Sequence, residues 1–337
     1  MRPFKESAAV ECRGYSHWLQ RAMVDFGADN PFGGAANKLK EHYGIEVPVS
    51  AVRTVTEAHG ESMRKNAPLQ TEIPDRPGVP QLIAETDGSM IPEVEISPAG
   101  QGEQPVDRRK ARKVKWTEAR LCLAHEPGSV TPVFGVSLAL LGGPDEAGLQ
   151  LMNCAIRAGA GTTTKLHCVG DGAQWIAEQV ELRFGLQGRY LVDLYHLCEY
   201  LAPAAERIAG KDKQDKQAWM DKQKQKMKEN RSSEVLQDLQ PFLEHDTVAD
   251  SDAPVRACHR YIRNRPGQFD YQTALQSGLP MGSGEVESAH RYVIQARLKI
   301  SGAWWKIDNA AKMLALRVTR ANENWNAYWD GLHRRAA

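Results

Sequence analysis

Acidic residues stand in three short stretches of the sequence where they could bind a metal ion. Asp87 and Asp171 each precede a glycine, and Glu285 and Glu287 follow a Gly-Ser-Gly run at 282–284. Carboxylate oxygens suit hard divalent cations such as Mg²⁺. Two such ions about 4 Å apart can activate an attacking oxygen and stabilise a leaving oxygen in phosphodiester cleavage. Each stretch also has a plain structural explanation, because Asp-Gly is a common turn and acidic residues favour the start of a helix.

The order of the surrounding elements predicts that the two aspartates meet. The apolar run 81–88 is typical of a strand that ends at Asp87, and 165–172 of a strand that ends at Asp171. The other elements expected in this region are strands at 118–125, 131–142 and 189–196 and helices at 145–159, 173–185 and 197–210. This order indicates a mixed α/β sheet whose later strands run parallel to the first. Sites in such sheets form outside the carboxyl ends of the parallel strands, so both carboxylates are expected to point at one place.

The two glutamates begin a predicted helix with one buried stripe. Its apolar residues recur at helical spacing, at Val286, Ala289, Val293, Ala296 and Ile300. Glu285 and Glu287 are two residues apart and therefore cannot share a face. One of them could give the site a third carboxylate while the other lies in solvent, and the spacing does not say which.

The remaining segments predict helical regions on either side of the sheet. Residues 1–65 are expected to be helical, with a break at Gly44 and a second helix capped by Ser50, which is the outline of a helix-turn-helix or of any small helical hairpin. Residues 66–80 carry four prolines and are expected to form a linker. Residues 209–280, rich in Lys, Gln and Asp, are expected to form an all-helical insertion.

Composition excludes several classes of protein. The chain has 337 residues, of which 42% are hydrophobic and 25% charged, an ordinary globular composition for two or three domains. No apolar run approaches the roughly 20 residues that span a bilayer, and the first residues lack the apolar stretch of a signal peptide, so we expect a cytoplasmic protein without membrane contact. The six cysteines form no CxxC pair, which argues against a zinc ribbon or a disulfide framework.

One basic cluster stands out against a net charge of only +1. The segment 107–116 holds six basic residues around a single Asp, namely Arg108, Arg109, Lys110, Arg112, Lys113 and Lys115. A solvated loop would have the same composition. Beside a site that cleaves phosphodiesters, however, such a cluster predicts contacts with DNA phosphates.

A set of motifs in fixed order resembles a known family. "ETDGSMIP", "VGDGAQWI", "VDLYHLCEYL", "GLPMGSGEVESAHR" and "ARLKISGAWW" are similar to the motif series of bacterial insertion-sequence DDE transposases of the Kra group, distantly related to Mutator-type enzymes. The resemblance covers about residues 80 to 330. It implies a ribonuclease-H-like core made of residues 81–208 and 281–337, with the insertion between them.

The resemblance also implies a metal site. Its acidic triad falls on Asp87, Asp171 and Glu287, because the pattern Gly-Ser-Gly-x-Val-Glu has the glutamate at its sixth position and Glu285 at the variable one. These residues would hold two Mg²⁺ or Mn²⁺ ions. His196, in a DxxH element, would contact a phosphate or orient a ligand, unless it only caps the helix that follows.

The implied activity is metal-dependent cleavage at transposon ends and strand transfer into target DNA. The implied partner is double-stranded DNA, bound by a nucleoid-associated homo-oligomer through the basic cluster and through Arg291, Arg297 and Lys299. A DNA-binding protein with a degenerate, non-cutting core and a stand-alone nuclease are the alternatives. Tryptophans 304, 305, 325 and 329 are expected in the core more than on bases.

Overall fold

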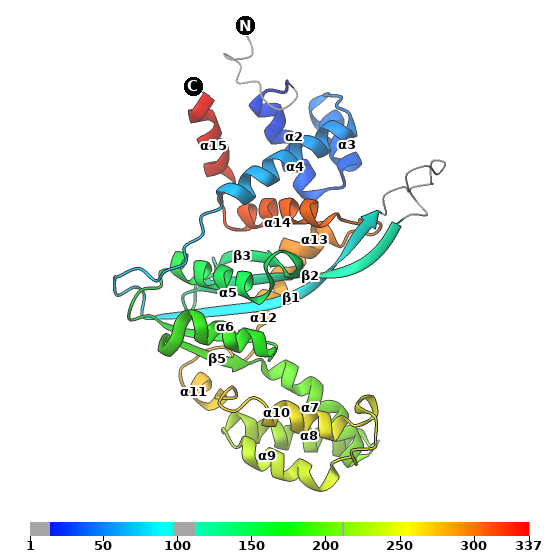
Figure 1. Ribbon diagram of the computed structural model, residues 1–337, viewed down its shortest axis with the longest axis vertical. Coiled ribbons are helices and arrows are strands. Elements are labelled where there is room, and N and C mark those ends of the chain that lie inside the picture. The colour runs from blue at the N-terminus through cyan, green and yellow to red at the C-terminus, as the bar shows by residue number, and fades with distance from the viewer. Residues whose placement is uncertain (1–13, 97–111, 211, 337) are drawn as a thin grey trace, which may run out of the picture.

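The computed structural model describes residues 14–96, 112–210 and 212–336 (Figure 1). Within these ranges, the helices before the sheet are α2 (His17–Asp29), α3 (Phe32–Tyr43) and α4 (Val49–Asn66). The strands are β1 (Gln81–Ile96), β2 (Arg112–His125), β3 (Val133–Leu138), β4 (Lys165–Gly170) and β5 (Gly188–Val192). Helices α5 (Ala139–Arg157), α6 (Gln174–Phe184) and α7 (Leu194–Ala209) follow β3, β4 and β5 respectively.

The strands form a mixed sheet in the order β3-β2-β1-β4-β5. β1 is antiparallel to β2 and β2 to β3, whereas β4 runs parallel to both β1 and β5. The predicted mixed α/β sheet, with its later strands parallel to the first, is therefore confirmed.

β1 does not end at Asp87, as predicted, but continues for nine further residues. Asp87 pairs with Leu121 and Gly88 with Arg120 inside the β1–β2 ladder. The glycine does not form a turn, and a Cβ at Gly88 would lie 2.3 Å from Oε1 of Glu118, so a larger residue there would displace that side chain. Beyond the reach of β3 and β4, β1 and β2 continue as a two-stranded arm (Figure 1), and β1 of the arm bonds through its backbone to Trp305.

Helices cover both faces of the sheet. On one face, Leu82, Ala84 and Cys122 pack against α5 and α6. On the other lie α12 (Gly284–Ala289), a π-helical turn (His290–Gln295), α13 (Ala296–Leu298) and α14 (Ile307–Ala321). Side chains alternate between faces along a strand, so Glu85 and Asp87 point to the α12 face.

The N-terminal helices share this second core with the end of the chain. Met23, Leu39 and Val55 pack in one cluster with Leu314 of α14 and Trp329 of α15 (Trp325–Ala336). Trp305 and Trp325 belong to the same cluster, whereas Trp304 is half exposed. Of the predicted helical region 1–65, the described residues from 14 onward thus share their core with the end of the chain, and the predicted linker is irregular from residue 67 to 80.

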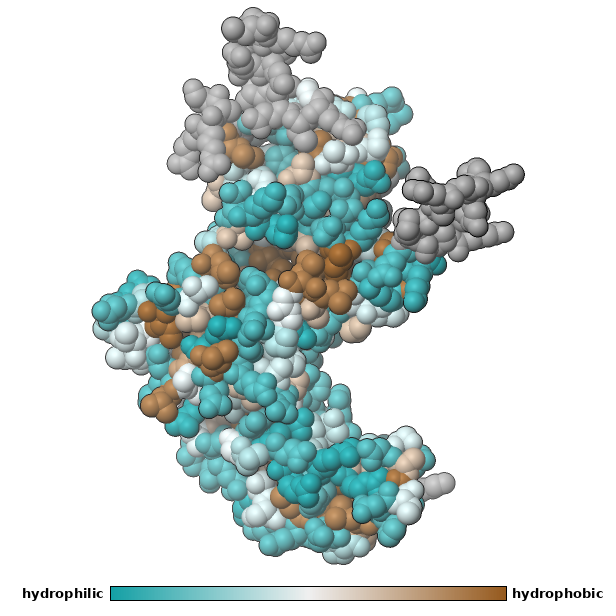
Figure 2. Space-filling view, in the orientation of Figure 1, coloured by the Kyte–Doolittle hydropathy of each residue, from teal (hydrophilic) through white to brown (hydrophobic). Residues whose placement is uncertain are grey.

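The predicted insertion is helical and shares one core cluster with α7 and the end of β5. It contains α8 (Lys213–Lys228), α9 (Ser232–Leu239), α10 (Pro254–Arg263) and α11 (Tyr271–Gln276), packed on α7. The insertion and the N-terminal helices lie at opposite ends of the molecule (Figure 1). Figure 2 shows a crescent-shaped outline, and the surface on this face is mostly hydrophilic.

Three local predictions at chain turns were wrong. Ser50 does not cap α4, because Pro48 is the residue before the helix and no side chain caps it. The strand expected at 131–142 ends at Leu138, where α5 begins, and the strand expected at 189–196 ends at Val192, just before α7.

Candidate functional site

The sheet register places Asp87 and Asp171 side by side. The parallel β1–β4 pairing ends at Glu85 and Val169, and each aspartate follows two residues later. Alternation along β1 puts the carboxylate of Asp87 on the face covered by α12, and Asp171 stands directly after the end of β4, in the turn to α6. The two backbone segments remain close at this level, since a Cβ at Gly170 would lie 3.4 Å from the carbonyl oxygen of Thr86.

Each aspartate uses one carboxylate oxygen in a contact with a neighbour. Oδ2 of Asp87 lies 3.3 Å from Nε2 of the buried His290. Oδ1 of Asp171 accepts a hydrogen bond of 2.7 Å from the N–H of Ala173, at the start of α6. Among the described residues, the other oxygen of each carboxylate makes no hydrogen bond or ion pair.

Glu285 and Glu287 lie on opposite flanks of α12. The helix follows β1 along the sheet, because the N–H of Val286 contacts Glu85 and His290 contacts Asp87. Oε2 of Glu285 lies 2.8 Å from Nε2 of His125 on β2, level with Ile83. That level is four residues before Asp87, or about 13 Å along the strand at about 3.3 Å per residue.

Glu287 follows two residues later, about 200° further around the helix axis. Its exposed side chain therefore lies on the flank nearer β4 and Asp171, one turn before His290. This geometry favours Glu287 over Glu285 as the third acid of the site, which the sequence alone left open.

The three acids do not close around a common point. Within the described residues, no group of three or more His, Cys, Asp or Glu side chains could hold a metal ion as it stands. The donor set nevertheless fits a hard cation, since two aspartates with a spare oxygen each and an exposed glutamate offer only oxygen ligands. Asp87 and Asp171 would hold the ion from the sheet, and Glu287 from the helix.

A fourth carboxylate, which the sequence analysis missed, lies beside them. Glu85 is buried, and its Oε2 accepts a hydrogen bond of 2.8 Å from the N–H of Val286 at the start of α12. Burial raises the pKa of Glu85 to about 8, and the nearby carboxylates of Glu285 and Asp193 add to this effect. A glutamate inside the apolar run 81–86 was the available signal.

The DxxH element has a structural role that centres on its aspartate. Oδ1 of the buried Asp193 accepts the N–H groups of Tyr195 and His196 and so caps α7. Oδ2 accepts both the N–H and the hydroxyl of Ser283, each at 2.6 Å, which ties the start of α12 to the end of β5. His196 lies in the first turn of α7 with Nδ1 3.4 Å from Glu199, and its contact with a phosphate stays a prediction.

The described part of the basic cluster lies on the arm. Arg112 and Lys113 are exposed on β2, and the guanidinium of Arg112 lies 5.5 Å from the ring centre of Trp304. Lys115 forms ion pairs with Glu93 and Glu95 of β1. Residues Arg108, Arg109 and Lys110 lie outside the described residues.

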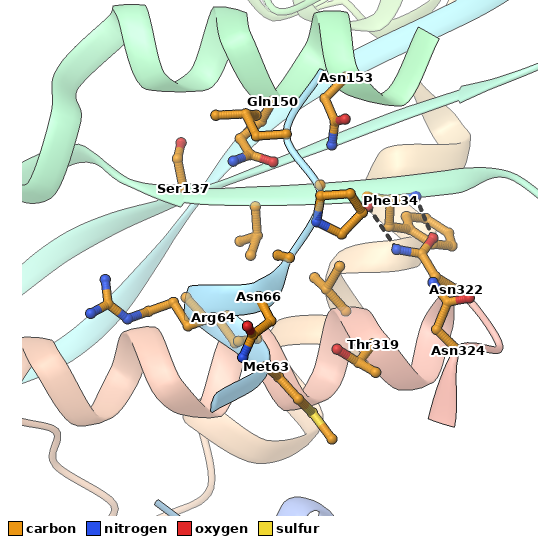
Figure 3. Close-up of a pocket in the computed structure, with 18 of the residues that line it drawn as sticks. Met63, Arg64, Asn66, Phe134, Ser137, Gln150, Asn153, Thr319, Asn322 and Asn324 are labelled. Atoms are coloured by element: carbon orange, nitrogen blue, oxygen red, sulfur yellow. Dashed lines mark hydrogen bonds between the residues drawn. The ribbon is translucent and has the colours of Figure 1, made fainter. Parts of the chain in front are cut away.

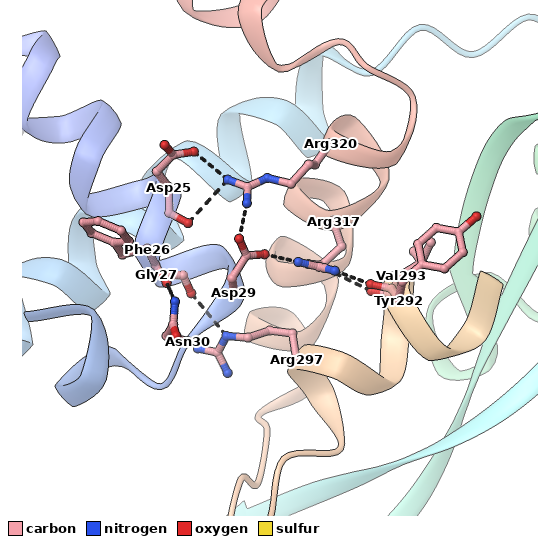
Figure 4. A network of polar contacts seen from close by, with 10 residues as sticks. All are labelled: Asp25, Phe26, Gly27, Asp29, Asn30, Tyr292, Val293, Arg297, Arg317 and Arg320. Atoms are coloured by element: carbon pink, nitrogen blue, oxygen red, sulfur yellow. Dashed lines mark hydrogen bonds and ion pairs between the residues drawn. The ribbon is translucent and has the colours of Figure 1, made fainter. Parts of the chain in front are cut away.

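The prediction that Arg297 contacts DNA was wrong. Its side chain is 2% exposed, its Nε donates to the carbonyl of Gly27, and its guanidinium lies against the rings of Phe32 and Trp305. Burial lowers its pKa to about 10. Figure 4 shows it beside a network in which Arg317 and Arg320 of α14 bind Asp29 of α2.

Arg291 and Lys299, by contrast, are exposed and stay candidates for contacts with phosphate. Arg297 follows the π-helical turn at His290–Gln295, where the α-helical spacing of the predicted stripe no longer holds, so its burial could not be predicted from that spacing.

A cleft of about 720 Å³ lies elsewhere, between β3, α4, α5 and α14. Figure 3 shows its lining, with the amide of Asn322 bonded to the backbone of Phe134 on the outer edge of β3. None of the four candidate acids lines this cleft, so it is not the site of the predicted chemistry. Along the described ranges, no helix is both long and apolar enough to cross a membrane.

Comparison with known proteins gives a family without a described activity. No curated protein matches the chain. The model of an uncharacterised protein family, UPF0236, matches residues 158–328, which extend from β4 through the insertion to α15 and include Asp171 and Glu287. The chain is therefore a member of the uncharacterised protein family UPF0236.

Proposed function

We propose that the protein is a DDE transposase with a ribonuclease-H-like core. The observation that carries this proposal is the position of Asp87 on β1 and of Asp171 just after β4, each two residues beyond the last β1–β4 pair, with the acidic helix α12 packed along β1. The strand order β3-β2-β1-β4-β5 and a helical insertion before the last acidic helix are what such a core is expected to have.

In the proposed mechanism, Asp87, Asp171 and Glu287 would hold divalent ions, which would supply activation of the attacking oxygen and charge stabilisation of the leaving oxygen of the cut phosphodiester. Glu85 and Asp193 hold the start of α12 against β1 and β5 through Val286 and Ser283. Cleavage frees the 3′-hydroxyls of the element, which then attack target DNA.

The DNA would lie along the arm and the exposed side of the α12–α13 segment. Arg112 and Lys113 on the arm, and Arg291 and Lys299 near the site, are the exposed cations that would contact phosphates. The helices α2–α4 would add contacts with the transposon end. Two ends must be held together for strand transfer, so we expect a homo-oligomer on DNA.

A second function, binding DNA without cutting it, is favoured by one observation. The acids of the described chain form no ready metal cluster, and Asp87 faces His290. Melting curves with increasing Mn²⁺ separate the two functions, because a ligand that binds only the folded state stabilises it. A rise in melting temperature supports the enzyme, and its absence supports the non-cutting protein.

The decisive test of transposition uses DNA that carries the inverted repeats flanking the gene. We expect nicks at the repeat ends and joined products when Mg²⁺ or Mn²⁺ and a target plasmid are present. Cut products without joined ones would make the protein a stand-alone nuclease. No products at any metal concentration would leave the proposed function without support.

A further inference from the structure

Resting on the proposed function, we infer that Tyr261 and Arg265 of the insertion are positioning residues for Asp171. They do not lie on the sheet that carries the acids. They come from the end of α10 and the residues after it, and they contact the turn that follows β4. This contact gives the insertion a role in the site.

The Asp171–Gly172 turn is held through its backbone by three side chains. The hydroxyl of Tyr261 donates to the carbonyl of Asp171 at 2.8 Å, and Nε of Arg265 donates to the carbonyl of Gly172 at 2.6 Å. The N–H of Gly172 donates to the hydroxyl of Tyr190 on β5 at 3.0 Å. Backbone groups that are bonded in this way fix the direction in which the Asp171 side chain leaves the strand.

The fit around the turn is close. Gly172 has a φ of +85°, which favours glycine, and a Cβ there would lie 2.3 Å from the hydroxyl of Tyr261 and 3.0 Å from Nε of Arg265. No other residue could occupy this position without moving both side chains. The glycine after Asp171 therefore serves the contact with the insertion as well as the turn.

The contacting side chains are themselves fixed within the insertion. The ring of Tyr261 is 5% exposed and stacks on Tyr200 of α7 with ring centres 3.9 Å apart and an angle of 19°. The guanidinium of Arg265 lies 3.8 Å from the centre of the Tyr261 ring and donates to the Tyr261 carbonyl. Any shift of α10 relative to the sheet must therefore reach Asp171, so DNA bound to the insertion would influence the geometry of the site.

The experiment compares Tyr261→Phe and Arg265→Lys with the matched control Tyr271→Phe. Tyr271 is also buried in the insertion, and its hydroxyl donates to a backbone carbonyl, that of Val192, at 2.9 Å. Amide hydrogen exchange of a peptide containing residues 171–174 is measured without metal. In the two test variants we expect exchange about tenfold faster than in the parent, which is the change expected from the loss of one buried hydrogen bond. In the control we expect exchange at the parent rate.

Cleavage kinetics with Mn²⁺ provide the second readout. Tyr261→Phe should lower kcat about tenfold and leave KM for DNA unchanged, because the hydroxyl holds an acid and does not touch DNA. Unchanged exchange in both test variants, or an equal change in Tyr271→Phe, would overturn the inference. A parent protein that cuts no DNA would overturn the proposed function instead, and the exchange measurement would still decide whether the insertion holds the turn.

Discussion

Glu85 is a buried acid whose protonation should be visible in the stability of the metal-free protein. Its pKa is raised by burial to about 8, from 4.5 in an exposed glutamate. Between these two pH values the folded chain holds a proton that the unfolded chain has released. The free energy of unfolding therefore falls as pH rises through this window, by about 1.4 kcal/mol per unit.

We predict that Glu85→Gln removes this fall in the free energy of unfolding with rising pH. The amide keeps an acceptor for the N–H of Val286 but carries no charge. Denaturant unfolding of both proteins between pH 5 and pH 8 should show the variant gaining on the parent as pH rises. Parallel curves over this range would mean that Glu85 is not buried as an acid.

At the scale of elements, the β1–β2 arm is predicted to bind DNA through charge alone. Replacing Arg112 and Lys113 by Ala should weaken binding to unrelated sequences about equally, because phosphate contacts carry no base information. The slope of log affinity against log salt should fall by about one to two, at about 0.9 for each lost phosphate contact. Lys115 should matter less, since it is already paired with Glu93 and Glu95.

The control for this measurement is Lys224→Ala. Lys224 lies on α8 in the insertion and pairs with Asp221 at 3.0 Å. The substitution of Lys224 removes one positive charge from the protein and leaves the arm unchanged. Equal salt slopes for the parent and the arm variant would identify the arm as a solvated hairpin.

The elements show where the sequence was sufficient and where it was not. Apolar runs and their order predicted the strands, because alternation and chain connectivity are local properties. The length of β1 was missed because Asp87-Gly88 has the composition of a turn, while the partner that keeps Gly88 in the strand, Arg120, is distant in the chain. The π-helical turn at His290–Gln295 shifts the residues after it, so Ala296, predicted on the buried stripe, is exposed.

The candidate site likewise has parts that the sequence could predict and parts that it could not. Asp87 and Asp171 could be paired from strand order. The choice of Glu287 required the contact of Glu285 with His125, and the roles of Glu85 and Asp193 required their bonds to Val286 and Ser283. These are contacts across about 90 to 200 residues of chain, which no local pattern encodes.

At the scale of the whole molecule, His59 joins the two ends of the chain. Its ring nitrogens lie 2.8 Å from the hydroxyl of Tyr328 on α15 and 2.9 Å from Oε1 of Gln20 on α2. Burial lowers its pKa to about 4, from 6.5. The unfolded chain therefore binds a proton on this histidine below pH 6.5, whereas the folded chain does not bind it until about pH 4. The folded state loses stability across this range as the pH falls.

We predict that acidification from pH 7 to pH 5 costs the parent about 2 kcal/mol through this group. His59→Gln should lack this contribution while keeping polar atoms near Gln20 and Tyr328. Unfolding free energies at the two pH values measure the difference. An equal loss in the variant would mean that His59 does not couple the terminal helices to acid.

The most direct test of the central claim is the rate of Mn²⁺-dependent cleavage of DNA carrying the element's ends, with Asp171→Asn and Glu287→Gln compared against Glu285→Gln. Each exchange keeps the shape of the side chain and removes its charge. Glu285 is a matched control, two residues from Glu287 and facing His125. The first two variants should lose more than about a hundredfold in rate, since even outer partners of metal ligands typically cost 10–100-fold, and Glu285→Gln should cut nearly as fast as the parent. Cleavage at the parent rate by Asp171→Asn, or a loss confined to Glu285→Gln, would contradict the assignment of Asp171 and Glu287 as metal ligands.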